Sequence, residues 1–267
     1  MPLPVDLANA FARARPRLGR LGTPVLFFPT VGSTNDIALG MATAGEGEGT
    51  VVIADEQRAG RGRLGRTWFS PPGSGLYVSV VLHPGATQGD RTRALALLTL
   101  AVGVAAAEGI EAATGLVTEL KWPNDVYVGR RKLGGVLAES VHAGAANPPV
   151  VVGIGINVGA AAYPPELQHR ATSLETALGR PVERAPVLAE TLSCLAGRYD
   201  DILRGRFDAI LDAWRARAPG SVGAPVAWTT GTSTRSGMTA GIDGHGALLV
   251  HDGAETERIV AGEVTWL

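Results

Sequence analysis

An arginine- and glycine-rich segment at residues 57–68, QRAGRGRLGRTW, has the residue types needed to hold an anion. Three of its glycines alternate with arginines: Gly60, Gly62, Gly65, Arg61, Arg63 and Arg66. Glycine lets backbone N–H groups approach phosphate oxygens, and a guanidinium group can bind a phosphate or carboxylate through two hydrogen bonds. A mobile surface loop or an RG-type nucleic-acid segment would have the same composition, so all three interpretations stay open. The Lys-Ser/Thr ending of a Walker loop is missing, which disfavours ordinary P-loop chemistry.

A second motif, KWPND at residues 121–125, places charge at the end of an apolar strand. Lys121 is a point cation suited to a phosphoryl or carboxylate oxygen, and the Asp125 carboxylate could hold magnesium. Pro123 forces the chain to turn. A simple turn with a solvated Lys–Asp pair would use the same residues, so the motif by itself does not decide between the two.

The other candidates for chemistry are a tryptophan, the histidines and a cysteine. Trp68 follows the arginine segment and could stack on a nucleobase, although a lone tryptophan more often belongs to a core. The histidines show no metal-ligand spacing, so we expect neither a catalytic zinc nor a haem. They are His83, His142, His169, His245 and His251. The single cysteine, Cys194, cannot form an internal disulfide, and its apolar neighbours are typical of a helix interior.

The composition is that of a globular protein without a strong overall electric field. Of 267 residues, 45% are hydrophobic and 18% are charged, and 24 Lys plus Arg against 25 Asp plus Glu give a formal net charge of -1. This balance predicts no broad surface for nucleic acid or anionic lipid, so a basic site must be local. The N-terminus lacks the apolar region of a secretory signal, and the longest apolar run, residues 94–107, is shorter than a membrane span. We therefore expect a cytoplasmic protein.

Alternating strands and helices must position these motifs. Apolar and β-branched runs predict strands at residues 25–28, 50–54, 76–82, 119–121, 136–141 and 150–158. Apolar spacing of three and four residues predicts helices at residues 91–114, 186–203 and 207–218. The run at 150–158 is apolar on both faces, which predicts a central strand. Ser33 followed by Asp36 is a capping-box variant that predicts a helix through residues 37–44.

Three parts of unequal size are expected along the chain, and together they predict the α+β class. Residues 1–24 form a short helical segment, too small at normal domain sizes for a winged-helix module, so we expect no DNA-binding domain. Residues 25–219 combine helices with a mixed sheet. Residues 220–267 consist of short alternating segments separated by Gly, Ser and Asp turns, which predicts a small all-β barrel.

In order and spacing, the two motifs resemble the signature of biotin protein ligases. Further matches are GSTND at 32–36, RKLGGVLAE at 131–139, VVGIGINV at 151–158 and GIDGHGALLV at 241–250. The resemblance runs from residue 25 to the C-terminus and implies a class II synthetase-like catalytic domain with an SH3-like β domain, of the monofunctional type that lacks a DNA-binding domain. It also implies that ATP and biotin give biotinyl-5'-AMP and pyrophosphate. Biotin then passes to a lysine of the biotin carboxyl carrier domain of an acyl-CoA carboxylase, and the enzyme is a monomer or weak homodimer.

The same resemblance implies roles for individual residues. The residues that it implies for biotin binding are Ser33, Thr34, Asn35, Gln57, Arg61, Gly62, Arg63, Lys121, Gly134 and Gly135. ATP or adenylate binding falls to Arg61, Arg63, Trp68, Lys121 and Asn157, with Trp68 on the adenine. Lys121, Arg61 and Arg63 are the catalytic group, and Asp125 is a Mg²⁺ contact. A carboxylate that attacks an α-phosphate brings like charges together, so these cations and Mg²⁺ supply the counter-charge. Because the arginines in residues 60–66 repel one another, we expect that segment to be mobile until it closes over the adenylate.

Two alternatives remain open at this stage. A lipoate-type acyl protein ligase shares the fold class and the adenylation chemistry, although GRGR followed by KWPND favours biotin. A non-catalytic nucleic-acid-binding module could use Arg61, Arg63 and Arg66. Its affinity would need a wider basic face than a net charge of -1 indicates.

Overall fold

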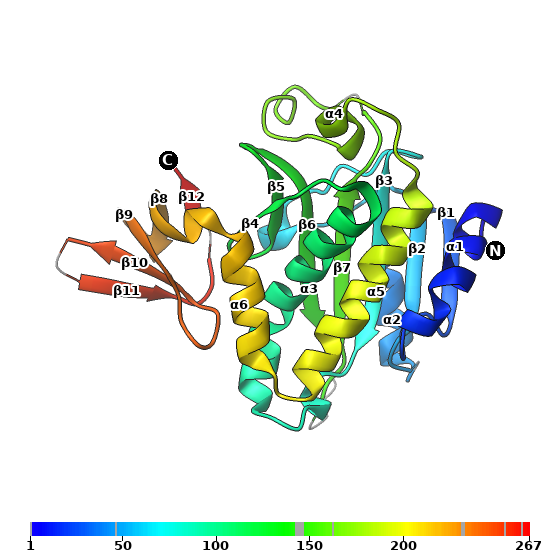
Figure 1. The fold of residues 1–267 in the computed structure, drawn as a ribbon, viewed down its shortest axis with the longest axis horizontal. Helices are drawn as coiled ribbons and strands as arrows, with labels where there is room; N and C mark the ends of the chain where they lie inside the picture. The colour runs from blue at the N-terminus through cyan, green and yellow to red at the C-terminus, as the bar shows by residue number, and fades with distance from the viewer. Residues whose placement is uncertain are drawn as a thin grey trace.

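The protein is built around two β-sheets, with helices packed on the larger one (Figure 1). The structure, a computed structural model, describes residues 2–45, 47–141, 147–161, 163–230, 233–253, 255–262 and 264–267. His142, one of the histidines considered above, lies outside the described residues. The mixture of a helix-covered mixed sheet and a second antiparallel sheet confirms the predicted α+β class.

The large sheet has the strand order β1-β2-β3-β7-β6-β5-β4. Its members are β1 (Val25–Val31), β2 (Val51–Gln57), β3 (Gly75–Leu82), β4 (Glu119–Lys121), β5 (Asp125–Val128), β6 (Arg131–Ser140) and β7 (Val150–Asn157). Among the described strands of this sheet, β1 and β2 pair in parallel and the other neighbours pair antiparallel. The central position predicted for the run at 150–158 is confirmed, because β7 lies between β3 and β6.

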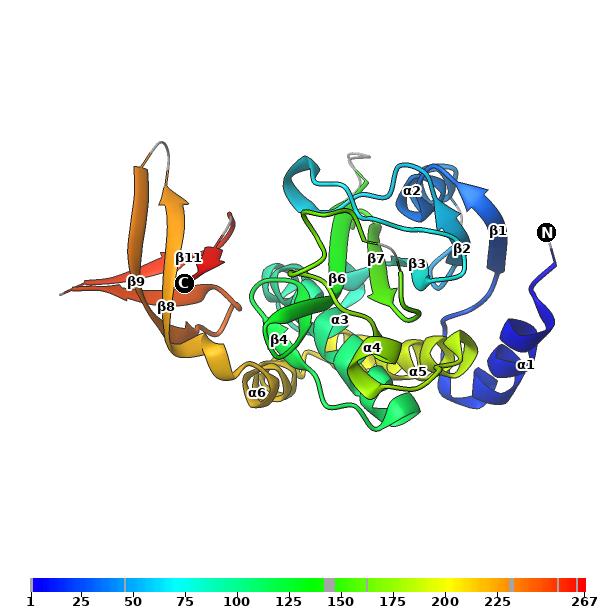
Figure 2. The same ribbon diagram turned by 90° about the horizontal axis from the view of Figure 1, so that it is seen from above.

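Helices cover both faces of this sheet (Figures 1 and 2). They are α1 (Val5–Ala14), α2 (Thr34–Thr43), α3 (Arg91–Thr114), α4 (Leu174–Leu178), α5 (Arg184–Leu203) and α6 (Phe207–Arg217). The helix predicted at 91–114 is confirmed at both ends. Asp90 caps its N-terminus by accepting from two backbone N–H groups, and Gly115 ends it in the left-handed conformation with φ 77.

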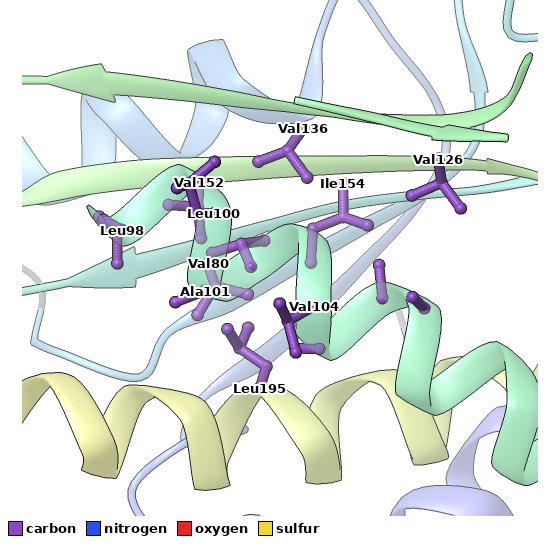
Figure 3. Packing of buried hydrophobic residues seen from close by; sticks show 14 of the residues in the cluster. Val80, Leu98, Leu100, Ala101, Val104, Val126, Val136, Val152, Ile154 and Leu195 are labelled. Carbon is purple, nitrogen blue, oxygen red and sulfur yellow. The ribbon is translucent and has the colours of Figure 1, made fainter. Parts of the chain in front are cut away.

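The main core lies between α3, α5 and one face of the sheet (Figure 3). Strand β7 sends Val152 and Ile154 into it, where Leu98 and Val104 of α3 and Leu195 of α5 are also buried. Side chains alternate between the faces of a strand, so Val151, Gly153 and Gly155 lie on the opposite face. That opposite face carries the candidate site described below.

Helix α3 as a whole is long and apolar enough to cross a membrane, but 72% of its most apolar window is buried inside the protein. The run at residues 94–107 is only part of this helix, so its short length does not by itself exclude a membrane span. Burial between the sheet and α5, and not length, marks it as a core helix.

Two local predictions are corrected by the structure. Strand β5 was not expected, because its four residues are too few to show a period. The N-cap position of Ser33 and the place of Asp36 in the first turn are confirmed, since α2 begins at Thr34. The capping hydrogen bond is not: the Ser33 side chain makes none, and Asp36 forms an ion pair with Arg61.

The second sheet contains β8 (Val222–Thr230), β9 (Ser233–Ile242), β10 (Leu248–Asp252), β11 (Glu255–Ile259) and β12 (Val264–Trp266). Their antiparallel order is β11-β10-β9-β8-β12, and the sheet extends away from the large one beyond α6 (Figure 2). It agrees with the small C-terminal β domain that the alternating pattern predicts.

The turn between β9 and β10 fastens the second sheet to the first part of the chain. Trp122 Nε1 donates to the Gly246 carbonyl at 2.9 Å, and Arg93 Nε donates to the Gly244 carbonyl at 2.8 Å. Gly246 has φ +78, and a Cβ there would lie 2.7 Å from Leu100 Cδ1. The close approach therefore requires glycine, and it sets where β12 lies relative to Lys121.

Candidate active site

A cavity of about 570 Å³ lies over the face of the large sheet that does not bear α3. Its walls are the start of α2, the arginine segment, the ends of β4 to β7, the segment after β7, and β12 of the second sheet. This volume is in the range of small-molecule and cofactor sites. Both parts of the chain therefore contribute to one cavity.

Two glycines, Gly135 of β6 and Gly155 of β7, lie on the floor of this cavity. Strand register pairs Lys121 with Asp125, Asp125 with Gly135, and Gly135 with Gly155. Residues paired across neighbouring strands project to the same face of a sheet. Lys121 and Asp125 thus share a face with two positions that have no side chain of their own, and the side chains of Lys132 and Trp68 lie over these two positions.

One end of the cavity is a buried polar network at the start of α2. Thr34 donates through its backbone N–H and its hydroxyl to Gln57 Oε1, at 2.9 and 3.0 Å. Ser79 Oγ donates to Asn35 Oδ1 at 2.6 Å, and Asn35 Nδ2 donates to Glu139 Oε2 at 2.7 Å. Because each group has a partner, the network holds its members in fixed orientations and can recognise a polar ring.

The arginine segment makes specific contacts over the cavity. Arg61 is held by Asp36 Oδ1 at 2.6 Å and by Glu139 Oε2 at 2.9 Å. Arg63 Nη1 donates to Asn124 Oδ1 at 3.3 Å, and burial lowers the pKa of this guanidinium. Two carboxylates thus pair with Arg61 before any ligand arrives, so for this arginine repulsion by its neighbours is already offset. Whether the segment moves on ligand binding stays a prediction.

The other end of the cavity carries two lysines. Lys132 Nζ lies 2.6 Å from Asp125 Oδ1. Lys121 Nζ instead lies over two aromatic rings, 5.0 Å from the centroid of Tyr127 and 5.2 Å from that of Trp266. Burial lowers the pKa of Lys121 to about 8, and the neighbouring Asp125 carboxylate opposes this shift. The partner of Asp125 is thus Lys132, so the motif is not a simple solvated Lys121–Asp125 turn.

Trp68 stands against the bare floor between these two ends. A Cβ at position 155 would lie 2.6 Å from Trp68 Cε2, so the ring uses the space that Gly155 leaves. The ammonium of Lys132 lies 5.4 Å from the centroid of the same ring. An indole in this place offers an aromatic face for stacking inside the cavity.

Two predicted residues have a mainly structural setting. Asn157 lines the cavity, but its Nδ2 donates to the Thr172 carbonyl at 2.9 Å and so ties the segment after β7 to the strand. Gly134 is not among the described residues that line the cavity, and a Cβ there would lie 2.8 Å from the Gly155 carbonyl oxygen. Its glycine permits close strand pairing.

The structure brings the other predicted residues together around the cavity. They are Ser33, Thr34, Asn35, Gln57, Arg61, Gly62, Arg63, Trp68, Lys121, Asp125 and Gly135. Sequence reasoning missed Ser79, Lys132, Glu139 and Trp266. Three of these carried a signal: Ser79 is the single serine in the apolar strand GLYVSVVL, and Lys132 and Glu139 belong to the motif at 131–139. For Trp266 no local signal exists.

Asp125 is the residue to consider for a divalent cation. Among the described residues, no group of three or more His, Cys, Asp or Glu could hold a metal ion. Mg²⁺ that travels with a nucleotide needs only one or two carboxylates in addition to phosphates and water. One carboxylate beside two lysines fits that requirement, although Lys132 already contacts one of its oxygens.

Comparison with known proteins relates the chain to acyl protein ligases. A profile described as "Biotin/lipoate A/B protein ligase family" matches residues 27–157. The biotin--[acetyl-CoA-carboxylase] ligase of Paracoccus denitrificans is 35% identical over 237 residues, covering 87% of this chain and 96% of that protein. The bifunctional ligase/repressor BirA of Bacillus spizizenii is also 35% identical, over 91% of this chain and 74% of the relative.

A solved structure of similar shape carries ligands. The biotin protein ligase from Aquifex aeolicus in complex with biotin and ATP superposes with a TM-score of 0.77 at 30% identity, covering 91% of this chain and 98% of that one. The chain therefore belongs to the biotin/lipoate A/B protein ligase family and is an enzyme of the biotin protein ligase type.

Proposed function

We propose that this ligase forms biotinyl-5'-AMP from biotin and ATP in the cavity over the large sheet and then transfers biotin to a protein lysine. The observation that carries the proposal is that one cavity joins the polar network at Thr34 and Asn35 to the half-buried ammonium of Lys121, with Trp68 between them. The bound biotin and ATP of the Aquifex aeolicus relative support the same pair of substrates.

The residues divide between two substrates. Ser33, Thr34 and Asn35 bind the polar ring of biotin, and Gln57 fixes Thr34 by accepting two hydrogen bonds from it. Trp68 stacks on the adenine. The biotin carboxylate and the α-phosphate meet near Lys121, below the arginine segment.

In the first step, a carboxylate oxygen of biotin attacks the α-phosphorus of ATP, and the bond to the pyrophosphate oxygen breaks. Negative charge gathers where two anions meet, and the cations Lys121, Arg61 and Arg63 stabilise it. Mg²⁺, when bound with ATP, would neutralise the phosphate oxygens, with Asp125 as its protein contact. In the second step, the amine of the acceptor lysine attacks the acyl carbon and AMP leaves. The protein side chains thus act by orientation and charge.

The acceptor we propose is a lysine of the biotin carboxyl carrier domain of an acyl-CoA carboxylase. The Paracoccus denitrificans relative is a biotin--[acetyl-CoA-carboxylase] ligase, which supports this choice. The cytoplasmic location, the absence of DNA binding and the monomeric or weakly dimeric state stay predictions from the sequence.

A transfer assay tests the function directly. Purified protein is incubated with ATP, Mg²⁺, labelled biotin and a biotin carboxyl carrier domain, with labelled lipoate in a parallel reaction. We expect ATP-dependent label on the carrier domain from biotin only. Transfer of lipoate without transfer of biotin would favour the lipoate-type alternative.

The pH dependence of adenylation should follow Lys121. Because burial lowers its pKa to about 8, the ammonium in the free enzyme loses its proton as the pH rises through that value. We therefore expect kcat/KM for pyrophosphate release to be constant below that pH and to fall above it, measured from about pH 6.5 to about 9.5. The Lys121→Arg variant, whose guanidinium stays charged in this range, should lack the decline in its residual activity. A decline of the parent enzyme only above about pH 10, the ordinary range of lysine, would contradict the assignment.

The arginine segment should retain the adenylate. Arg63→Gly removes a guanidinium over the cavity and its contact with Asn124, so we expect adenylate to form but to escape to bulk lysines. An unrelated bystander protein, incubated with enzyme, ATP and biotin, should then carry several times more label than with the parent enzyme. Arg63→Lys, which keeps the charge, serves as the control. Equal bystander labelling by the parent and Arg63→Gly would mean that Arg63 does not retain the intermediate.

A further inference from the structure

Glu139, near the end of β6, joins the polar network at the start of α2 to the arginine segment. Its Oε2 accepts from Asn35 Nδ2 at 2.7 Å and from Arg61 Nη2 at 2.9 Å. Glu139 is not among the described residues that line the cavity, whereas both of its partners are. Any influence of this carboxylate on a ligand therefore passes through Asn35 or Arg61.

The carboxylate decides which way the Asn35 amide faces. A carboxylate oxygen only accepts hydrogen bonds, so the atom of Asn35 that faces Glu139 must be Nδ2. The amide oxygen then faces β3, where Ser79 Oγ lies 2.6 Å from Asn35 Oδ1. The hydroxyl proton of Ser79 is thereby committed to Asn35.

Two hydroxyl protons serve three contacts in this network. Ser79 Oγ lies 2.8 Å from Thr34 Oγ1 as well as next to Asn35, and Thr34 Oγ1 lies 3.0 Å from Gln57 Oε1. When Ser79 donates to Asn35 and Thr34 donates to Gln57, no proton is left for Thr34 Oγ1 among the described residues. Thr34, Asn35 and Ser79 are at most 4% exposed, so bulk water hardly reaches them. Thr34 Oγ1 is thus a buried acceptor without a donor.

A ligand that donates a proton completes this network. Thr34 lines the cavity, so a ligand N–H can reach its Oγ1. The urea ring of biotin carries N–H groups, whereas the dithiolane ring of lipoate has no donor. A ligand without a donor leaves the buried acceptor unsatisfied, which lowers its affinity.

We propose that Glu139 is a positioning residue that makes this network selective for a ligand N–H. Its carboxylate forbids the opposite orientation of the Asn35 amide, because two acceptor oxygens would then face each other. In that orientation Asn35 Nδ2 would donate to Ser79, and Ser79 would donate to Thr34 Oγ1. The network would then be complete without a ligand. The proposal rests on biotin as the substrate proposed above.

Glu139→Gln removes this constraint with little change of shape, because an amide can donate as well as accept. The probes are biotin and the two cyclic carbamates in which oxygen replaces one N–H of the urea ring. Calorimetry without ATP measures the affinity of each. We expect the parent to bind at least one carbamate about a hundredfold more weakly than biotin.

In Glu139→Gln this ratio should fall to about tenfold or less. With Thr34 Oγ1 already supplied by Ser79, the N–H of biotin gains less there, so the change comes from weaker binding of biotin. An unchanged ratio in Glu139→Gln would overturn the proposal. A parent that binds both carbamates as tightly as biotin would overturn it as well.

A reciprocal exchange tests whether Glu139 acts through the Asn35 amide. When Glu139→Gln is combined with Asn35→Asp, the carboxylate at position 35 accepts from Ser79 and from the amide at position 139. An acceptor again faces Ser79, so we expect the double variant to recover the ratio of the parent to within about threefold. A ratio as low as that of Glu139→Gln alone would contradict the proposal. A merely structural role of Glu139 predicts no such recovery.

Asp36→Asn is the matched control for the other partner of Glu139. Asp36 Oδ1 pairs with the same nitrogen, Arg61 Nη2, at 2.6 Å, and its substitution leaves the bond between Asn35 and Glu139 in place. The ratio of affinities should therefore equal that of the parent. A fall as large as in Glu139→Gln would place the effect at Arg61 and overturn the proposal. If the proposed function itself were wrong, the parent would neither bind biotin nor form adenylate, which none of these outcomes resembles.

Discussion

Replacing Lys121 by alanine should lower the rate of adenylate formation by about a thousandfold while the fold stays intact. Lys121 is the last residue of β4, and the register places it in one row across the sheet with Asp125, Gly135 and Gly155. Removing one preorganised charge from a developing anionic transition state costs about 10²–10³ in rate, and the cost is greater where burial reduces screening.

Pyrophosphate release from biotin and ATP measures the effect of Lys121→Ala. Circular dichroism and the melting temperature show whether the variant is folded. The Lys121→Arg variant tests whether a positive charge at this position is sufficient for pyrophosphate release. The transfer step can be followed separately by supplying preformed biotinyl-5'-AMP. Release at the parent rate would refute the role of Lys121, and an unfolded variant would show that the residue is structural.

Substituting each of the two glycines of β7 that face the cavity should weaken the binding of a different substrate. A Cβ at Gly155 would lie 2.6 Å from the edge of the Trp68 ring, and a Cβ at Gly153 would lie 2.3 Å from Asn35 Oδ1. At such distances a neighbour must move. We therefore expect Gly155→Ala to weaken ATP binding by at least about tenfold with little change for biotin, and Gly153→Ala to do the reverse.

Calorimetry with each substrate alone measures this selectivity. Gly40→Ala is the matched control, because a Cβ there meets nothing within 4 Å and alanine favours the helix that contains it. Its affinities for both substrates should equal those of the parent. Equal losses of affinity for ATP and for biotin in both variants would show a general disturbance of the sheet. They would contradict the assignment of ATP and biotin to different ends of the cavity.

The second sheet contributes an aromatic ring to the site. Lys121, the residue with the largest expected effect, lies in the first sheet, but one of the two rings over its ammonium comes from the second. Substitutions at the β9–β10 turn, which docks on α3, would therefore act on adenylation without touching a substrate. Gly246 is the sensitive position there, since any Cβ would press on Leu100.

The secondary structure was predictable where local signals agreed. Helix α3 matches its prediction because Asp90 and Gly115 are a cap and a stop within one turn of its ends. The capping box at Ser33 failed because the Asp36 carboxylate has a stronger partner in Arg61, 25 positions further along the chain (61 − 36). Here a long-range ion pair took the carboxylate that the local capping rule assigns to the helix N-terminus.

The sequence by itself determined the kind of chemistry. Arginines among glycines, a lysine at a strand end and a tryptophan nearby are local motifs, and their resemblance to biotin protein ligases was readable without coordinates. Tertiary structure alone decided which side chains complete the site. Register sets which residues share a face of a sheet. The pairing of β6 with β7 therefore places Gly135 and Gly155 side by side on the floor of the cavity. Docking of the second sheet brought Trp266 to Lys121, and no periodicity along a chain encodes a contact that depends on the packing of two sheets.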